Sequence, residues 1–250
     1  AIGNFRSFNV SADHMVTVSG VAPVTNFLAR IYDNNATLIQ GRIQQGAGGL
    51  VNMTMVNSNG IAFMGGSRVN LNSFTASTLN LADSFVMGSF LTNDSKTPQF
   101  QYDLAGNEGH GTIKVLERAE ITAGQFGRVL LIAPTVVNKG TITAPDGQII
   151  AAAGTKVFLR SASGQDNSVN GLLVEVDSST SLEGFDVPNP QGINGELDGV
   201  AVNLTDAADN KLGHVTNAGT LSTPRGNITM VGYAVNQKGI ARATTSVVAN

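Results

Sequence analysis

Short apolar runs, separated by bends rich in Gly, Asn and Pro, recur along this chain. Residues 129–133 (Val-Leu-Leu-Ile-Ala) and 148–152 (Gln-Ile-Ile-Ala-Ala) are typical of these runs, which suit strands. Few windows place apolar residues at i, i+3, i+4 and i+7 without an intervening Gly, Pro or Asn. The pattern therefore predicts many short strands joined by tight corners, with minimal helix.

The chain also repeats itself. Residues 138–154 match residues 217–232, and four positions share one offset of 79 (217 − 138). A weaker copy begins at Asn236, and residues 121–123 match residues 142–144 at an offset of 21 (142 − 121). An offset near 20 is about one coil of a parallel β-helix, and on this interpretation 79 corresponds to about four coils.

These repeats predict an all-β chain folded as a right-handed parallel β-helix. One coil cannot bury its inward side chains, but stacked coils bury a continuous aliphatic column and pair their strands. Asn residues at matching corners, such as Asn138 and Asn217, could form side-chain ladders along the axis. We expect residues 1–250 to form a single domain.

Two stretches interrupt the pattern. Residues 84–111 are richer in Phe, Asp and Gly than the coils, which predicts an insertion, such as an extra-helical hairpin. Residues 161–214 contain the loop at 186–192 (Asp-Val-Pro-Asn-Pro-Gln-Gly), and we interpret them as coils with long loops.

Composition narrows the function classes. Charged residues are 13% of the chain, the formal net charge is −3 and no basic patch is present, so nucleic acid is not expected as a partner. With 0 cysteines, zinc–thiolate sites, Fe–S clusters, thiol nucleophiles and disulfides are all excluded. Absence of disulfides also suits a protein that crosses a bacterial envelope unfolded. No apolar run is long enough to span a bilayer and no signal peptide opens the sequence, so an export signal would lie outside it or have been removed.

The first third of the chain carries more specific motifs. Residues 57–61 read Asn-Ser-Asn-Gly-Ile, and residues 69–79 read Val-Asn-Leu-Asn-Ser-Phe-Thr-Ala-Ser-Thr-Leu. Upstream lie residues 5–10, 29–31 and 38–43 in the same order. This succession resembles the amino-terminal domain of filamentous-haemagglutinin-like exoproteins, which are exported by two-partner secretion. It looks closest to the branch of high-molecular-weight adhesins and haem–haemopexin-utilisation proteins.

The resemblance implies two motifs in this chain. The first is the secretion and folding motif Asn57, Ser58, Asn59, Gly60 and Ile61, in which Ser58 stands where the family has Pro. The second comprises Val69, Asn70, Ala76, Ser77, Thr78 and Leu79. A further departure from the family is that the strands that normally precede the Ser-Phe-Asn segment are missing.

The resemblance also implies a function. The chain would be the secretion domain of a large adhesin-like exoprotein, secreted or held at the bacterial surface. Its partner would be an outer-membrane transporter with periplasmic polypeptide-binding domains, and the domain would nucleate β-helix folding outside the cell. We expect a monomer with no cofactor, no metal, no membrane span and no enzyme activity. Any contact with a host surface or polysaccharide is expected of downstream regions.

Residues alone give a simpler interpretation of the first motif. Asn-Gly tolerates positive φ, and Asn side chains can complete a turn, so residues 57–61 form a tight turn on this view. The two interpretations are compatible, because a turn that fails to form would alter the folding route. The sequence is compatible with direct contact between the motif and the transporter and with a role in folding alone.

Two other functions compete with export. One is a carbohydrate-active β-helix enzyme, since Gly109-His110-Gly111 and Thr92-Asn93-Asp94 resemble polygalacturonase segments. Such hydrolysis needs paired carboxylates, and only Asp103 and Glu108 lie between these stretches. The other is an adhesin that binds a host ligand directly through an aromatic-lined groove, although aromatic residues are only 6% of the chain.

The remaining candidate sites can be explained without a bound metal ion or a modification. Four oxygen-bearing residues could in principle hold Ca²⁺, but their spacing fits no loop geometry, and three histidines are too scattered for zinc. Asn-x-Ser/Thr sequons are expected by composition in so Asn- and Thr-rich a chain, although glycosylation is possible. These residues are Asp186, Asn194, Glu196 and Asp198; His14, His110 and His214; and Asn9, Asn35, Asn52, Asn93, Asn203 and Asn227.

We predict that the chain does not cleave pectin-like polysaccharides, because no carboxylate pair or nucleophile–base set stands out. Release of reducing ends from polygalacturonate would be measured with the wild type and His110→Ala. Reproducible cleavage that disappears in the variant would contradict the prediction.

Overall fold

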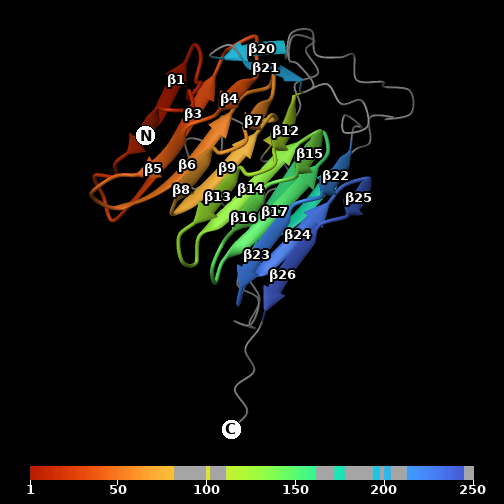
Figure 1. The fold of residues 1–250 in the computed structure, drawn as a ribbon. Helices are drawn as coiled ribbons and strands as arrows, with labels where there is room; N and C mark the ends of the chain where they lie inside the picture. The colour runs from red at the N-terminus through yellow and green to blue at the C-terminus, as the bar shows by residue number, and fades with distance from the viewer. Residues whose placement is uncertain are drawn as a thin grey trace.

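The computed structural model describes residues 1–81, 100–101, 111–161, 172–177, 194–197, 200–203 and 213–244, and these residues form strands and connections without helix. Most of the strands run side by side in an elongated stack, from the N-terminal end to the C-terminal end (Figure 1). The prediction of an all-β chain is confirmed in this part of the protein.

Three parallel sheets make up the stack. Sheet A contains β1 (Ile2–Phe5), β3 (Val24–Ile31), β6 (Leu50–Val56), β9 (Ser73–Ser77), β14 (Arg128–Ala133), β17 (Gln148–Ala153) and β24 (Asn227–Val231). Sheet B contains β4 (Thr37–Ile39), β7 (Ile61–Phe63), β12 (Thr112–Val115), β15 (Thr135–Asn138), β22 (His214–Asn217) and β25 (Ala234–Gln237). Sheet C contains β2 (Met15–Val18), β5 (Arg42–Gln45), β8 (Arg68–Leu71), β13 (Glu120–Ala123), β16 (Thr141–Thr143), β23 (Thr220–Pro224) and β26 (Ile240–Thr244).

The chain visits these sheets in the repeating order A, B, C. Each round is one coil, and the described strands make seven coils, one for each strand of sheet A. In the first coil, sheet B is represented by Val10, which bridges to Ile39 in parallel. The predicted parallel β-helix is therefore confirmed.

Inward side chains of successive coils stack into apolar columns. In sheet C, the register aligns Val69, Ile121, Ile142 and Leu221, all of them buried. In sheets B and A, Phe63 and Phe74 meet edge to face inside the helix, with ring centroids 5.7 Å apart. These columns form one core that runs through the stack.

The repeat offsets have different structural meanings. Ile121 pairs with Ile142, so the offset of 21 is one coil, as predicted. Asn138 pairs directly with Asn217, so the offset of 79 is also a single coil, and its interpretation as four coils is wrong. The reason is that the chain leaves the stack after β17 and returns only at β22. The last repeat is also shifted by one residue, since Gln237 rather than Asn236 pairs with Asn217.

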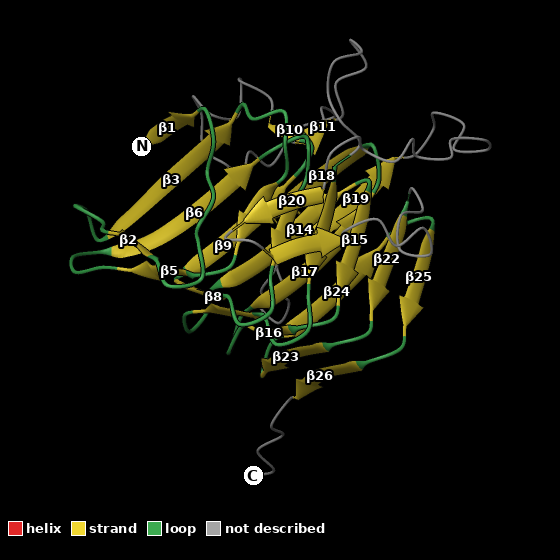
Figure 2. Cartoon of the chain, turned by 45° about the horizontal axis from the view of Figure 1, so that its top comes forward, coloured by secondary structure: helices red, strands yellow, loops and turns green. Residues whose placement is uncertain are grey.

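The departures from the stack build a second, antiparallel sheet. It consists of β10 (Asn80–Leu81), β11 (Phe100–Gln101), β18 (Lys156–Ser161) and β19 (Leu172–Asp177). Two strands come from the connection after β9 and two from the connection after β17, so the two excursions are joined where β11 pairs with β18. Figure 2 shows these strands beside sheet A.

A second apolar cluster attaches this sheet to the outer face of sheet A. Leu130 and Ile132 of β14 pack into it together with Phe100, Val157 and Leu172. Their neighbours Val129 and Leu131 point into the main core instead. Because both faces of β14 are buried, its sequence is a continuous apolar run rather than an alternating one.

The expected insertion at 84–111 lies largely outside the described residues, as does the loop at 186–192. The described strands between 156 and 203 all pair antiparallel, including β20 (Asn194–Leu197) with β21 (Val200–Asn203). None of these described strands joins the three parallel sheets, so the coils expected within 161–214 are not found among them. The boundaries of the single domain stay a prediction.

Polar side chains bridge the coils at their corners. Asn138 donates to Asn217 at 2.7 Å, and Asn217 donates to Gln237 at 2.9 Å, which confirms the predicted ladder. At the corner that leads from sheet C to sheet A, Arg225 donates to Asp146 at 2.7 Å. The hydrogen bond from Arg225 lowers the pKa of the Asp146 carboxyl, so this ion pair persists until low pH. Because the pair is exposed, it adds little to the strand pairing that joins the two coils.

Truncation of the sheet C column should destabilise the stack. Ile142→Ala removes a fully buried side chain between Ile121 and Leu221, and we expect it to lower the free energy of unfolding by about 2–5 kcal/mol. Thr143→Ala, on the partly exposed side of the same strand, is the control and should change it by about 0.5 kcal/mol or less. Urea denaturation followed by circular dichroism measures both, and equal losses would contradict the assignment of the column.

Candidate functional site

The turn at residues 57–61 lies at the corner between β6 and β7, where the third coil passes from sheet A to sheet B. Asn57 is 0% exposed. Its Nδ2 donates to the Asn35 carbonyl at 3.0 Å and to Thr37 Oγ1 at 2.9 Å, both in the coil before. Its Oδ1 accepts the Asn59 N–H at 2.9 Å, which closes the turn on itself.

Gly60 completes this turn in a conformation that favours glycine. Its φ is +120°, and its N–H donates to the Asn57 carbonyl at 3.1 Å. Its own carbonyl accepts the Thr37 N–H at 2.9 Å, while Asn59 Nδ2 donates to the Asp33 carbonyl at 2.7 Å. The predicted tight turn is therefore present, and it is bonded to the second coil through residues 33–37.

The second motif divides between two parts of the fold. Val69 is in the sheet C column and Asn70 is exposed on the outer face of that sheet. Ala76 points into the core from β9, and Ser77, Thr78 and Leu79 follow it at the next corner. The structure thus places residues 69–70 in sheet C and brings residues 77–79 beside the first motif.

The contacts between the two motifs are direct. The Asn57 N–H donates to the Ser77 carbonyl at 3.0 Å. Ser77 Oγ donates to the Leu79 carbonyl at 2.8 Å and accepts the Leu79 N–H at 3.0 Å, which fixes the bend after β9. We call residues 57–61, residues 77–79 and Gly111 the motif corner.

Gly111 was not predicted as a site residue, yet it joins both motifs. Its N–H donates to the Ser58 carbonyl at 3.0 Å, and its carbonyl accepts Thr78 Oγ1 at 2.8 Å. A Cβ on this residue would lie 2.4 Å from the Ser58 oxygen and 2.5 Å from the Gly60 nitrogen. The sequence carries no local signal for this role, because Gly111 lies 32 positions after Leu79 (111 − 79), the last residue of the second motif.

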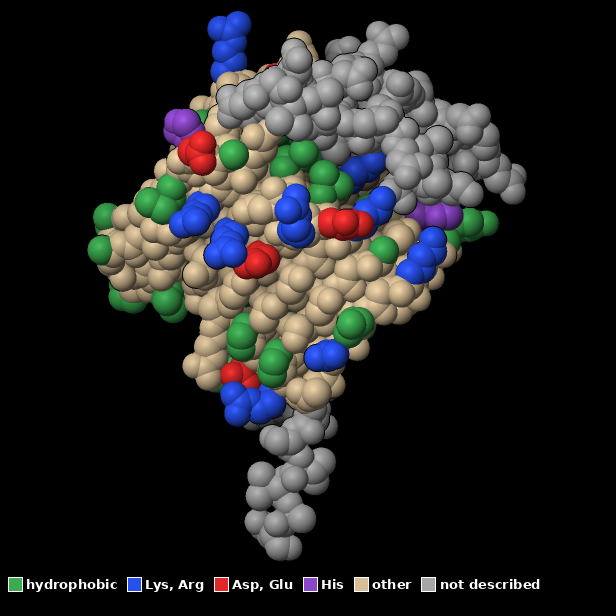
Figure 3. Space-filling model, viewed as in Figure 1, with side chains coloured by type: hydrophobic (Ala, Val, Ile, Leu, Met, Phe, Trp, Pro, Cys, Tyr) green, Lys and Arg blue, Asp and Glu red, His purple; other side chains and the backbone are tan. Residues whose placement is uncertain are grey.

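Every contact named at this corner is a hydrogen bond between neutral groups. Such a set holds main chain in place and offers no acid–base pair for catalysis. Among the described residues, no three His, Cys, Asp or Glu side chains gather to hold a metal ion. His110, Asp103 and Glu108 lie outside the described residues, as do Asp186 and Asp198. On the face in Figure 3, charged side chains stand in small mixed groups within a largely neutral polar surface.

Comparison with known families identifies the group to which this fold and corner belong. The family described as the TPS (two-partner secretion) secretion domain matches residues 1–240. The chain belongs to this family. Its members are secretion domains rather than enzymes, and the protein is therefore exported through the periplasm to the cell surface or the medium. Membership of the family implies an outer-membrane transporter as partner.

A solved structure shares the fold. The secretion domain of HMW1 from Haemophilus influenzae superposes with a TM-score of 0.63 over 92% of this chain, at 19% identity. The chain spans 48% of the length of that structure. Comparison with curated protein sequences gives no match. In the described part of this TPS domain, no helix is long and apolar enough to cross a membrane.

The close approach at Gly111 gives a stability prediction. Gly111→Ala should lower the free energy of unfolding by about 1–3 kcal/mol, because the new Cβ must displace main-chain atoms. Gly124→Ala is the control: Gly124 has no positive φ, and the atom nearest to its new Cβ would be Asn72 Oδ1 at 3.2 Å, the end of a side chain that can shift. Thermal unfolding of the purified TPS domains measures both. A Gly111→Ala domain as stable as the wild type would disprove the tight junction.

Proposed function

We propose that this TPS domain is the export-directing part of a large adhesin-like exoprotein. The unfolded domain engages the periplasmic polypeptide-binding domains of its transporter and folds into the β-helix only outside the cell. It acts as a monomer, without cofactor, nucleic acid or catalysis. The absence of cysteine supports this route, since no disulfide can lock the chain in the periplasm.

The observation that carries the proposal is the burial of Asn57 at the motif corner. Asn57 is 0% exposed, so its amide offers a partner no surface on the folded domain. Its hydrogen bonds instead tie the third coil to the second and the fourth. We therefore assign the corner a folding role, in which it aligns early coils so that later ones can add to them.

Folding outside the cell gives the export its direction. A folded stack cannot re-enter the transporter as an extended chain, so each coil added outside makes backward movement costlier. The first coils to emerge depend on their corners for register. Loss of the corner would then stop export at its beginning rather than slow it uniformly.

The double variant Asn57→Ala with Gly60→Val tests this role. Valine at positive φ costs on the order of 1–2 kcal/mol, and each lost hydrogen bond at the buried corner costs about 1–3 kcal/mol. We expect a fused passenger to remain in the periplasm instead of reaching the medium. The control His110→Ala should export normally.

Two measurements are read together: the amount of passenger in the medium, and the thermal unfolding of the purified variants. Failed export with lower stability is the expected result. Normal export by the double variant would refute any role for the corner. Failed export with unchanged stability would contradict the folding role and favour direct contact with the transporter.

A further inference from the structure

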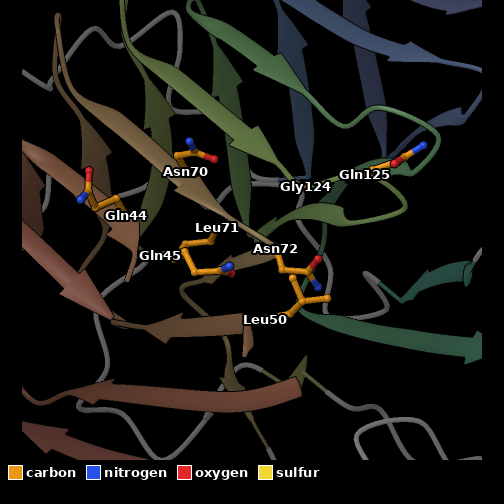
Figure 4. A pocket seen from close by; sticks show the side chains of 8 residues that line it. All are labelled: Gln44, Gln45, Leu50, Asn70, Leu71, Asn72, Gly124 and Gln125. Atoms are coloured by element: carbon orange, nitrogen blue, oxygen red, sulfur yellow. The ribbon is translucent and has the colours of Figure 1, made fainter. Parts of the chain in front are cut away.

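An open pocket on the outside of the β-helix has no part in the motif corner. It lies where β5 and β8 end and the chain turns from sheet C toward sheet A (Figure 4). Five of its lining side chains are amides, and a partly exposed leucine stands at its edge. These residues are Gln44, Gln45, Asn70, Asn72, Gln125 and Leu50.

The pocket is neutral, and part of its hydrogen-bonding capacity is in use. Gln45 Oε1 accepts the Val51 N–H at 2.8 Å, Asn72 Nδ2 donates to Asn52 at 2.7 Å, and Gln125 Nε2 donates to Asp146 at 3.1 Å. Within the part of the chain that the structure describes, the amides of Gln44 and Asn70 have no protein partner. They are neighbours in register on adjacent strands, and each offers donors and an acceptor.

Elsewhere this chain uses the same groups to bind extended main chain. Gln148 Oε1 accepts the Leu172 N–H at 2.8 Å, and its Nε2 donates to the Leu172 carbonyl at 3.0 Å. That single amide therefore pairs with both main-chain groups of one residue in β19, a strand outside the stack. Asn9 Oδ1 similarly accepts the Leu38 N–H at 2.8 Å.

We propose that this pocket binds an extended, uncharged polypeptide segment of a partner protein. Gln44 and Asn70 pair with the main-chain N–H and C=O groups of that segment, as Gln148 does with Leu172. Leu50, 46% exposed, contacts one of its apolar side chains. The residues that line the pocket carry no charge, so they offer a charged segment no counter-charge. The segment is a polypeptide rather than a glycan because main-chain pairing by amides already occurs in this chain.

The test uses the folded domain and a defined probe, the capped peptide acetyl-Thr-Val-Thr-Val-Thr-amide. Its binding is followed by NMR through the side-chain NH₂ signals of Asn and Gln. We expect a saturable shift of the Gln44 and Asn70 signals. Gln44→Ala with Asn70→Ala should weaken binding by about tenfold or more, which is the loss of roughly two main-chain pairings.

Two controls separate main-chain pairing from other effects. Thr141→Ala with Thr220→Ala, on the same outer face of sheet C, should bind the peptide like the wild type. The same peptide N-methylated at alternate residues should bind about tenfold more weakly, because it lacks donors. Thermal unfolding of the Gln44/Asn70 double variant must match the wild type, since both side chains face outward.

Three results would overturn the proposal: no saturable shift with the peptide, unchanged binding by the Gln44/Asn70 double variant, or saturable binding of the neutral tetrasaccharide cellotetraose in place of the peptide. None of these results bears on the export experiment, which depends on a different corner of the molecule.

Discussion

Register between neighbouring coils is the constraint on which this domain depends. An inward side chain is buried only if the coils on either side place apolar side chains above and below it. The sheet C column from Val69 to Leu221 shows the outcome, with each member paired to the next across a parallel ladder. A strand that slips by one residue along a parallel ladder turns its apolar face outward. Each corner must therefore set the register of the strand that follows it.

The motif corner meets this constraint with the buried amide of Asn57 and two glycines. Asn57 completes its own turn and donates to Thr37 in the previous coil. The Ser77 carbonyl accepts a hydrogen bond from this turn, and the Gly111 N–H donates one to it. Two motifs that are distant in sequence are thus one structural unit. Gly111 immediately precedes β12, so its contact with Ser58 holds the chain at the point where β12 joins sheet B.

The sequence allowed the architecture to be predicted but not the path of the chain. The offset of 21 and the continuous apolar runs follow from local rules, because one coil length and two buried strand faces leave direct traces. The offset of 79 is also a sequence repeat, but it arises from one coil with a long excursion. Sequence spacing alone does not distinguish that arrangement from four coils. The turn at residues 57–61 was predictable from Asn-Gly. The roles of Gly111 and Thr37 depend on contacts across coils, for which a single sequence carries no local signal.

Both excursions begin after a strand of sheet A and return at a strand of sheet B, after β9 and after β17. The chain is thus free to change length at this edge while the coils keep theirs. Loop-closure entropy changes slowly with length, so doubling an excursion costs only about 0.6 kcal/mol. Shortening a coil by one residue instead turns an entire strand over. Insertions and deletions among relatives should therefore collect at these two connections, and foreign epitopes grafted there would leave the stack intact.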